Sequence, residues 1–271
     1  MLIKGDLSYR EGLTELWHNV FGDDYDYIDY FFEKAYPYCD TFITLSDGKP
    51  ASAFYLLPCY IDYEGKRYKG KYLYAAATLP EYRGKGLMAE LINEAIFYCR
   101  NSSETDFISL VPADEGLYGY YGRFGFKTAM YRYVTGISDS FYCSGYISEK
   151  IENSSEFYNL RDKLSVNKFI FDECLSDYVF SSMINEGCTF GKIHGGGYFI
   201  CDGETVYEFI SYDGENISHS CFKGRTEAYS PSDLSFCGES RAVPFGMIYP
   251  CCNELTREWN FTDIYMNLAL N

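Results

Sequence analysis

The chain has 271 residues, a net charge of −16 at pH 7 and an apolar content of 47%. This much apolar sequence can fill a core, so a wholly disordered protein is excluded. The negative charge argues against general nucleic-acid binding, because a surface that holds phosphate backbones needs an excess of cations. We therefore expect one large domain or two smaller ones, with no nucleic-acid partner.

The sequence shows no sign of a membrane span, an export signal or a metal site. The longest apolar runs, 51–58 and 72–77, are far shorter than the roughly 20 residues of a membrane span. Residues 1–20 lack a cationic start followed by an apolar stretch, so no signal peptide is expected. The 11 cysteines form no C-x-x-C pair and are accompanied by 3 histidines, which favours reduced, buried thiols over zinc ligands. We expect a cytoplasmic protein without a metal or a membrane partner.

Hydrophobic periodicity in the first half of the chain alternates between the strand and the helix patterns. In chain order we expect a strand at 1–4, helices at about 8–20 and 24–35, strands at 41–45, 51–57, 60–63 and 68–78, a helix at 87–100, a strand at 106–111, a helix at 114–123 and a strand at 126–134.

A similar order begins again near residue 148. We expect helices at 154–164 and 171–185 and strands at 189–193, 197–201, 206–211, 242–249 and 264–270, with the polar stretch 213–240 unassigned. The order of two helices and three strands echoes the first half, which suggests a degenerate duplication. We therefore divide the chain into an α+β domain at 1–140 and a smaller α+β domain at 150–271.

The junction between residues 74 and 94 carries the strongest chemical signal. A strand leads into Arg83-Gly84-Lys85-Gly86, and an amphipathic helix follows at once. Two glycines allow a tight turn, and the N-terminus of the helix adds unpaired N–H donors that suit a pyrophosphate. Taken alone, such a joint is more often a plain turn. Six cations over 66–85 face one acid, Glu81, which fits either a bound polyanion or a solvated hairpin.

This junction resembles motif A of the GNAT superfamily of N-acetyltransferases, whose pattern is Arg/Gln-x-x-Gly-x-Gly/Ala. Arg83, Gly86 and Leu87 fit it, and Met88 departs from the small residue usual at the last position. A second block, Tyr120-Tyr121-Gly122-Arg123-Phe124-Gly125-Phe126, is similar to motif B of the family. The spacing leaves room for one helix and one strand between the blocks. The resemblance covers roughly residues 1–135.

The resemblance implies a GNAT fold, with a mostly antiparallel central sheet flanked by helices, and acetyl-CoA as co-substrate. The backbone of Ala77, Thr78 and Leu79 would bind the pantetheine arm. The pyrophosphate would lie on the turn formed by Arg83, Gly84, Lys85, Gly86, Leu87 and Met88. The resemblance also places Tyr121 near the thioester sulfur, where a phenol can return a proton to the departing thiolate. If the chain is a duplication, the C-terminal domain is a degenerate GNAT-like half.

The base that deprotonates the amine stays open among three groups. Asp114 and Glu115 follow the strand 106–111, although acids at that point commonly cap a helix. A narrower resemblance, to the enhanced-intracellular-survival branch of the family, adds the terminal carboxylate of Asn271. This chain is much shorter than members of that branch.

The expected function is acetyl transfer from acetyl-CoA to a primary amine of a small cationic molecule, by direct attack on the thioester. The net negative charge favours a cationic substrate. The alternatives are a non-catalytic acyl-CoA-binding or regulatory module, which Met88 motivates, and an N-acetyltransferase of proteins or peptides. The sequence is compatible with a homo-oligomer.

Overall fold

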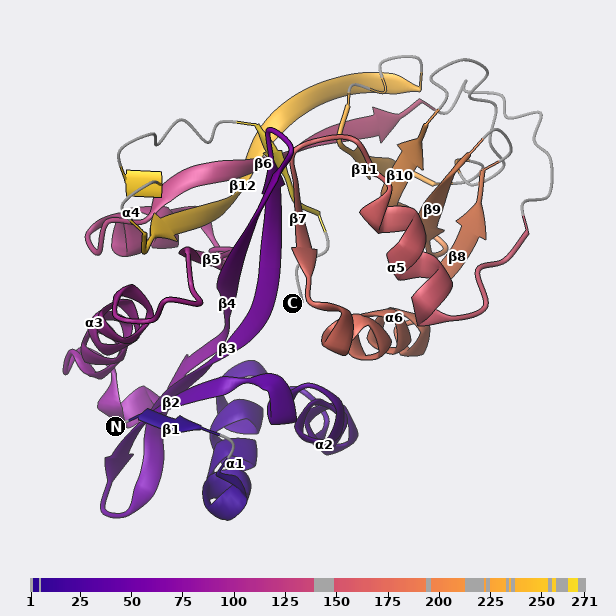
Figure 1. Cartoon of the computed structure of the whole chain (residues 1–271). Helices are drawn as coiled ribbons and strands as arrows, with labels where there is room; N and C mark the ends of the chain where they lie inside the picture. The colour runs from indigo at the N-terminus through magenta and orange to yellow at the C-terminus, as the bar shows by residue number, and fades with distance from the viewer. Residues whose placement is uncertain are drawn as a thin grey trace.

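The computed structural model describes residues 2–4, 6–138, 149–193, 196–212, 222, 225–232, 234, 237–252, 255–256 and 263–267. Within these residues the strands join into one sheet of 13 (Figure 1). The fold is mixed α+β, as the sequence predicts, and the sheet runs through both halves of the chain. Among the described helices, none is both long and apolar enough to cross a membrane.

The first half follows the expected order closely. Its elements are β1 (Leu2–Lys4), α1 (Arg10–Phe21), α2 (Tyr25–Lys34), β2 (Asp40–Ser46), β3 (Lys49–Tyr63), β4 (Lys66–Thr78), α3 (Leu87–Arg100), β5 (Phe107–Leu110), α4 (Glu115–Gly122) and β6 (Lys127–Ile137). The two strands expected at 51–57 and 60–63 are one long strand, β3, because Pro58 is accommodated between them without a break.

The second half differs more from the expectation. Its elements are α5 (Ser154–Asp162), β7 (Lys168–Phe171), α6 (Ser176–Asn185), β8 (Thr189–Lys192), β9 (Gly197–Cys201), β10 (Thr205–Ser211), β11 (Glu227–Ser230), β12 (Gly238–Pro250) and β13 (Ile264–Tyr265). The helix expected from residue 171 begins at Ser176, and a strand that the sequence analysis missed, β7, precedes it.

Strands from the two halves are interleaved in the sheet. β12 lies between β5 and β6 and is antiparallel to both. β7 pairs with β3, and β13 joins β7 to β6. Starting from β3, the pairings run through β4, β5, β12, β6, β13 and β7 and return to β3, so they form a closed circuit. In Figure 1, β6 and β12 extend from the N-terminal part to β11.

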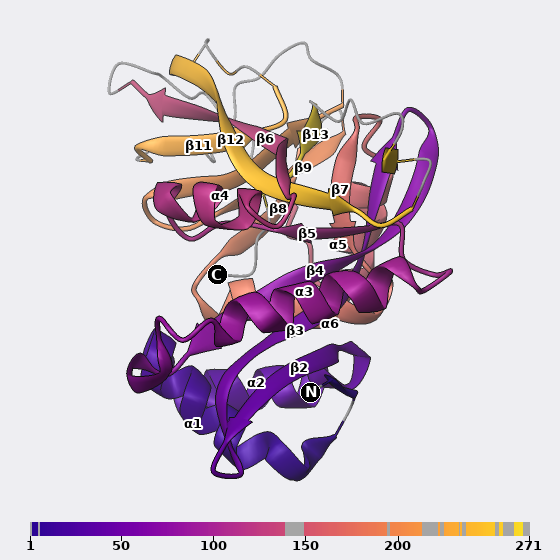
Figure 2. The ribbon, with the colours of Figure 1, turned by 90° about the vertical axis from the view of Figure 1, so that its left-hand side faces the viewer.

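Helices cover the two faces of the N-terminal sheet. α1 and α2 bury one face, in a core that includes Trp17, Tyr72 and Tyr74. α3 and α4 bury the opposite face, with Leu91, Ile92 and Tyr121 (Figure 2). The alternation of side chains along β4 therefore supplies both cores.

β4 contains a bulge next to the place where it leaves β5. Ala53 pairs with Ala77 and Tyr55 with Tyr74, so Ala75 and Ala76 together lie opposite one residue of β3. Ala75 has a φ of 50°, a left-handed conformation that is uncommon for residues other than glycine. Bulges of this kind redirect a strand and are frequent beside functional sites.

The left-handed conformation of Ala75 predicts how β4 responds to substitution at this position. A β-branched side chain tolerates positive φ poorly, so Ala75→Val is expected to lower the free energy of unfolding by about 2 kcal/mol. Ala75→Gly relieves the strain but frees the unfolded chain, and the two effects should cancel to within about 1 kcal/mol. Urea denaturation of the three proteins tests this, and a valine variant as stable as the parent would contradict it.

Candidate active site

A large cavity opens where β4 and β5 separate. The two strands are paired in parallel from Gly70 with Phe107 to Tyr72 with Ser109, and β4 then continues to Thr78 beside β3, separated from β5. The cavity has a volume of about 640 Å³, which is in the usual range for small-molecule sites. Its walls include residues from α1, β4, β5, α4, β6 and β12.

The cavity connects the two faces of the sheet. Trp17 and Tyr74 line it from the face covered by α1 and α2, whereas Leu117 and Tyr121 line it from the face covered by α4. Two molecules entering from opposite faces can therefore meet between β4 and β5. This arrangement suits a reaction between a co-substrate and a separate acceptor.

Tyr121 is a buried phenol on this cavity. Its exposed fraction is 7%, and its ring makes an edge-to-face contact with Phe126 at a centroid distance of 6.0 Å. Burial raises the pKa of Tyr121 to about 12. The side chain is therefore a neutral hydrogen-bond donor throughout the physiological pH range.

The glycine turn that precedes α3 has the geometry of an anion site. Gly84 and Gly86 have φ values of 75° and 82°, and α3 begins at Leu87. The N–H groups of the first turn of a helix have no acceptor within the helix and carry its positive partial charge. Met88 packs against the core under α3, so its side chain is directed towards the sheet. The larger residue at this position is thus compatible with an accessible turn.

Residues 4–129 match the family model described as an acetyltransferase (GNAT) domain. This part of the chain has the GNAT fold. No curated protein sequence matches the chain.

Solved structures share the fold over a longer range than the family model. A probable N-acyltransferase from Enterococcus faecalis V583 has a TM-score of 0.71 at 15% identity, over 93% of this chain and 72% of that one. A GCN5-related N-acetyltransferase from Kribbella flavida gives 0.66 at 13%, over 93% and 72%. Eis1 from Mycobacterium abscessus gives 0.65 at 8%, over 93% and 74%. At these identities the similarity is one of fold, and it extends well beyond the GNAT domain.

In the GNAT domain, the backbone expected to bind pantetheine is partly engaged with β3. The N–H of Leu79 donates to Ala51 at 3.0 Å, and the hydroxyl of Ser52 donates to the carbonyl of Ala77 at 3.0 Å. The carbonyl of Thr78 accepts from Nε of Arg83 at 3.1 Å, which ties the glycine turn to the end of β4. Ala75 and Ala76, which were not among the expected site residues, also line the cavity. No local sequence signal marks them, since the bulge arises from pairing with β3.

The cations of residues 66–85 do not gather at one site. Lys71 forms an ion pair with buried Asp40 at 2.7 Å. Arg67 contacts Asp62 and Asp162, each at 2.6 Å. Lys85 lies over the ring of Tyr82, 4.8 Å from its centroid, beside the glycine turn. Arg67 and Lys71 thus belong to ion pairs, and Arg83 and Lys85 lie at the turn.

The candidate bases lie in different places. Asp114 accepts a hydrogen bond from the N–H of Leu117 at 3.1 Å, so it is the N-cap of α4, and both Asp114 and Glu115 line the cavity. Asn271 lies outside the described residues. Asp23 is a further acid on the cavity that no sequence motif marks, and it accepts a hydrogen bond from the indole N–H of Trp17 at 2.7 Å.

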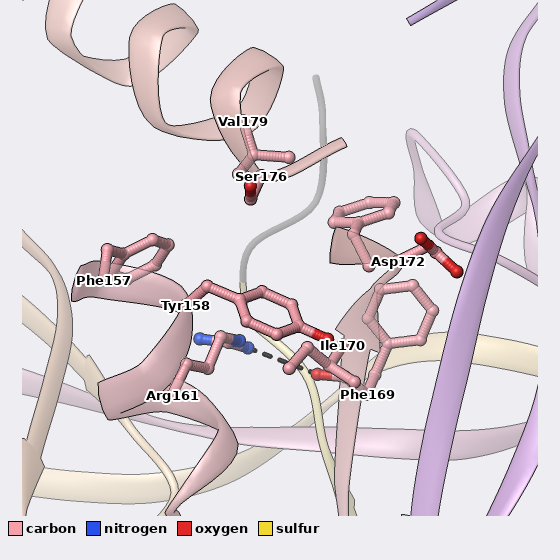
Figure 3. A pocket seen from close by; sticks show the side chains of 9 residues that line it. Phe157, Tyr158, Arg161, Phe169, Ile170, Asp172, Ser176 and Val179 are labelled. Carbon is pink, nitrogen blue, oxygen red and sulfur yellow. Dashed lines mark hydrogen bonds between the residues drawn. The ribbon is translucent and has the colours of Figure 1, made fainter. Parts of the chain in front are cut away.

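A second cavity, in the C-terminal part, is too small for a substrate. Figure 3 shows its lining, in which Arg161 donates to the carbonyl of Phe169 at 3.4 Å. Its volume is about 20 Å³, enough for one water molecule. Arg161 also forms an ion pair with fully buried Glu208 at 2.5 Å. This charge pair is satisfied internally, and we assign it a structural role.

The positive φ angles of the glycine turn predict how it responds to substitution. A Cβ at Gly86 would meet open space, so Gly86→Ala costs only backbone strain, about 1–2 kcal/mol. If the bound state needs this conformation, the Kd for acetyl-CoA should rise about tenfold. Gly136→Ala is the matched control, because its Cβ also meets open space and its φ is ordinary. Calorimetric titration measures both, and an unchanged Kd for Gly86→Ala would exclude the turn as a phosphate site.

Proposed function

We propose that this protein transfers the acetyl group of acetyl-CoA to a primary amine by direct attack on the thioester. The observation that carries the proposal is the cavity that joins the two faces of the sheet and contains buried Tyr121. The pyrophosphate would lie on the turn at 83–88, and the thioester would lie between β4 and β5. Tyr121 would then donate its proton to the departing thiolate.

The acceptor is proposed to be a small cationic molecule. A second large cavity, of about 650 Å³, lies between α2 and α6. Its lining includes Asp24, Asp26 and Glu186 together with tyrosines, and Asp23 on the main cavity is the neighbour of Asp24 in the chain. Burial and the charge of Asp23 raise the pKa of Glu186, as expected where negative charges are concentrated. Such a surface attracts amines and holds them against aromatic rings.

The same site supports three further parts of the proposal. The candidate bases remain Asp114, Glu115 and the terminal carboxylate of Asn271, and Asp23 joins them because it lines the cavity. Among the described residues no two cysteines are joined by a disulfide, which fits a reducing compartment such as the cytoplasm. β12 pairs with β5 and β6, so we propose that the C-terminal part completes the catalytic sheet as well as covering it.

Release of free thiol tests the proposed function. The protein is incubated with acetyl-CoA and a panel of diamines, polyamines, aminoglycosides, amino acids and short peptides, and thiol release is followed by absorbance. Turnover of small amines supports the proposal, whereas preference for peptides would favour a protein N-acetyltransferase. Stabilisation against heat by acetyl-CoA without turnover of any amine would indicate a non-catalytic binding module.

A further inference from the structure

Arg132 of β6 is a cation on the main cavity that the proposed chemistry does not use. Its guanidinium lies between two aromatic rings, with its central carbon 4.0 Å from the centroid of Tyr229 and 4.0 Å from that of Phe245. Both Arg132 and Phe245 line the cavity. The rings hold the planar group in a fixed orientation and leave its edges to make hydrogen bonds.

Only part of the hydrogen-bonding capacity of this guanidinium is used among the described residues. Nη1 donates to Oδ1 of Asn267 at 2.8 Å. Nε is buried, and it has no acceptor among the described residues. A buried donor without an acceptor is costly, so such a group in a native protein calls for an explanation.

No described carboxylate forms an ion pair with Arg132. The nearby acid Glu227 accepts a hydrogen bond from the hydroxyl of Tyr229 instead. Asn267, which contacts the guanidinium, is neutral and donates through its own amide to the carbonyl of Tyr207. Burial lowers the pKa of Arg132, yet a guanidinium stays protonated at neutral pH. The cavity therefore contains a positive charge whose partner is not among the described side chains.

Arg132 lies on the acceptor side of the cavity. Phe245, on which it stacks, packs against the core under α1 and α2. The glycine turn opens α3, which covers the opposite face of the sheet. The phosphates of acetyl-CoA would bind at that turn, so they are not the natural partner of Arg132.

We propose that Arg132 binds a carboxylate of the acceptor, so that the acetylated molecule is an amine that also bears a carboxylate. This inference rests on the proposed function and narrows its substrate class to amino acids and similar zwitterions. The N–H groups of a guanidinium lie in one plane and can pair with both oxygens of a carboxylate, and among the described residues Nη1 has one acceptor and Nε has none. The acidic groups around Asp23 would attract the amine end, and Arg132 would fix the opposite end.

Matched pairs of ligands that differ only in the carboxylate test the proposal. Lysine is compared with cadaverine, ornithine with putrescine, and lysine with lysinamide, each by calorimetric binding in the presence of CoA and by kcat/KM. We expect the carboxylate to improve binding and kcat/KM about tenfold or more, as a charge-assisted bidentate pair does. Arg132→Gln should bring the ratio within each pair close to one, and Arg132→Lys should restore part of it. Arg10→Gln, which removes a surface arginine lying over Phe32, should keep the parent ratio.

The outcomes separate this proposal from the proposed function. Carboxylate-dependent binding without turnover would remove the proposed function and retain the role of Arg132. Turnover of amines with equal preference within every pair would support the proposed function and overturn the role of Arg132. If Arg132→Gln does not fold, the pairs measured on the parent protein still decide. A preference that emerges only after the chain is extended by four residues past Asn271 would show that Arg132 holds the terminal carboxylate of the chain, and would overturn the proposal.

Discussion

A chain that ends at residue 140 is expected to lose its cooperative fold and its activity. Such a chain lacks β12, and the facing edges of β5 and β6 would then have no partner strand. Met247 and Ile248 of β12 are 3% and 0% exposed, and each fills one of the two cores. Their loss alone removes about 3–6 kcal/mol of burial, against a typical total stability of about 5–15 kcal/mol. Circular dichroism during heating, together with limited proteolysis, measures the effect.

Returning the missing strand provides the control for this truncation. Residues 1–138 joined by a flexible linker to residues 237–252 should recover a cooperative thermal transition, because β12 again separates β5 from β6. A truncated chain that melts cooperatively and turns over amines at the parent rate would contradict the expectation. It would also show that the GNAT domain is independent of the rest of the chain.

The dependence of the N-terminal part on β12 separates the parts of the fold that the sequence predicts from those that it does not. The helix at 87–100 and the glycine turn before it were predicted correctly, because periodicity and turn chemistry are local properties. The strand at 242–249 was also predicted correctly, and it lies within β12. Its place between β5 and β6 was not, since more than 100 residues separate the partners along the chain and no short-range pattern encodes that pairing.

The second half of the chain shows more clearly which strands a sequence pattern does not predict. Residues 168–171 form the strand β7, with Lys168 only 3% exposed and its ammonium held by the carbonyls of Asp162 and Leu164. A buried lysine beside a short apolar run does not indicate a strand, so residues 165–170 were left unassigned and a helix was expected from residue 171. The polar stretch 213–240 contains the strand β11, at Glu227–Ser230, which pairs with β6 and β10. In both places the partner strand determines the structure.

The residues of the candidate site also divide into those that a sequence motif marks and those that it does not. Tyr121 and the glycine turn are marked by sequence motifs, and the structure places Tyr121 on the main cavity. Arg132, Asp23 and Ala75 carry no such mark, because each reaches the cavity through the arrangement of whole elements. Which residues line the main cavity therefore depends on the positions of α1, β6 and β12, which no local pattern predicts.

Tyr121→Phe is expected to reduce kcat by about 100-fold or more, which is the usual contribution of a positioned general acid. The substitution removes only the hydroxyl, and the ring keeps its contact with Phe126, so the Kd for acetyl-CoA should change little. Tyr120→Phe is the matched control: this neighbour on α4 is only partly buried, packs against the same core and is not part of the cavity lining. Steady-state kinetics with the best amine of the panel, together with calorimetry for acetyl-CoA, separates chemistry from binding.

The pH dependence of kcat gives an independent test of the same proton donor. Because burial raises the pKa of Tyr121 to about 12, the phenol keeps its proton to higher pH than a free tyrosine does. Activity that depends on this proton is therefore fully present below that pKa and declines only as the pH approaches it. We expect kcat to show no alkaline decline between about pH 8 and pH 10.5. A decline with an apparent pKa near 9, or a Tyr121→Phe variant that keeps the parent kcat for every amine, would assign the proton transfer to a different group.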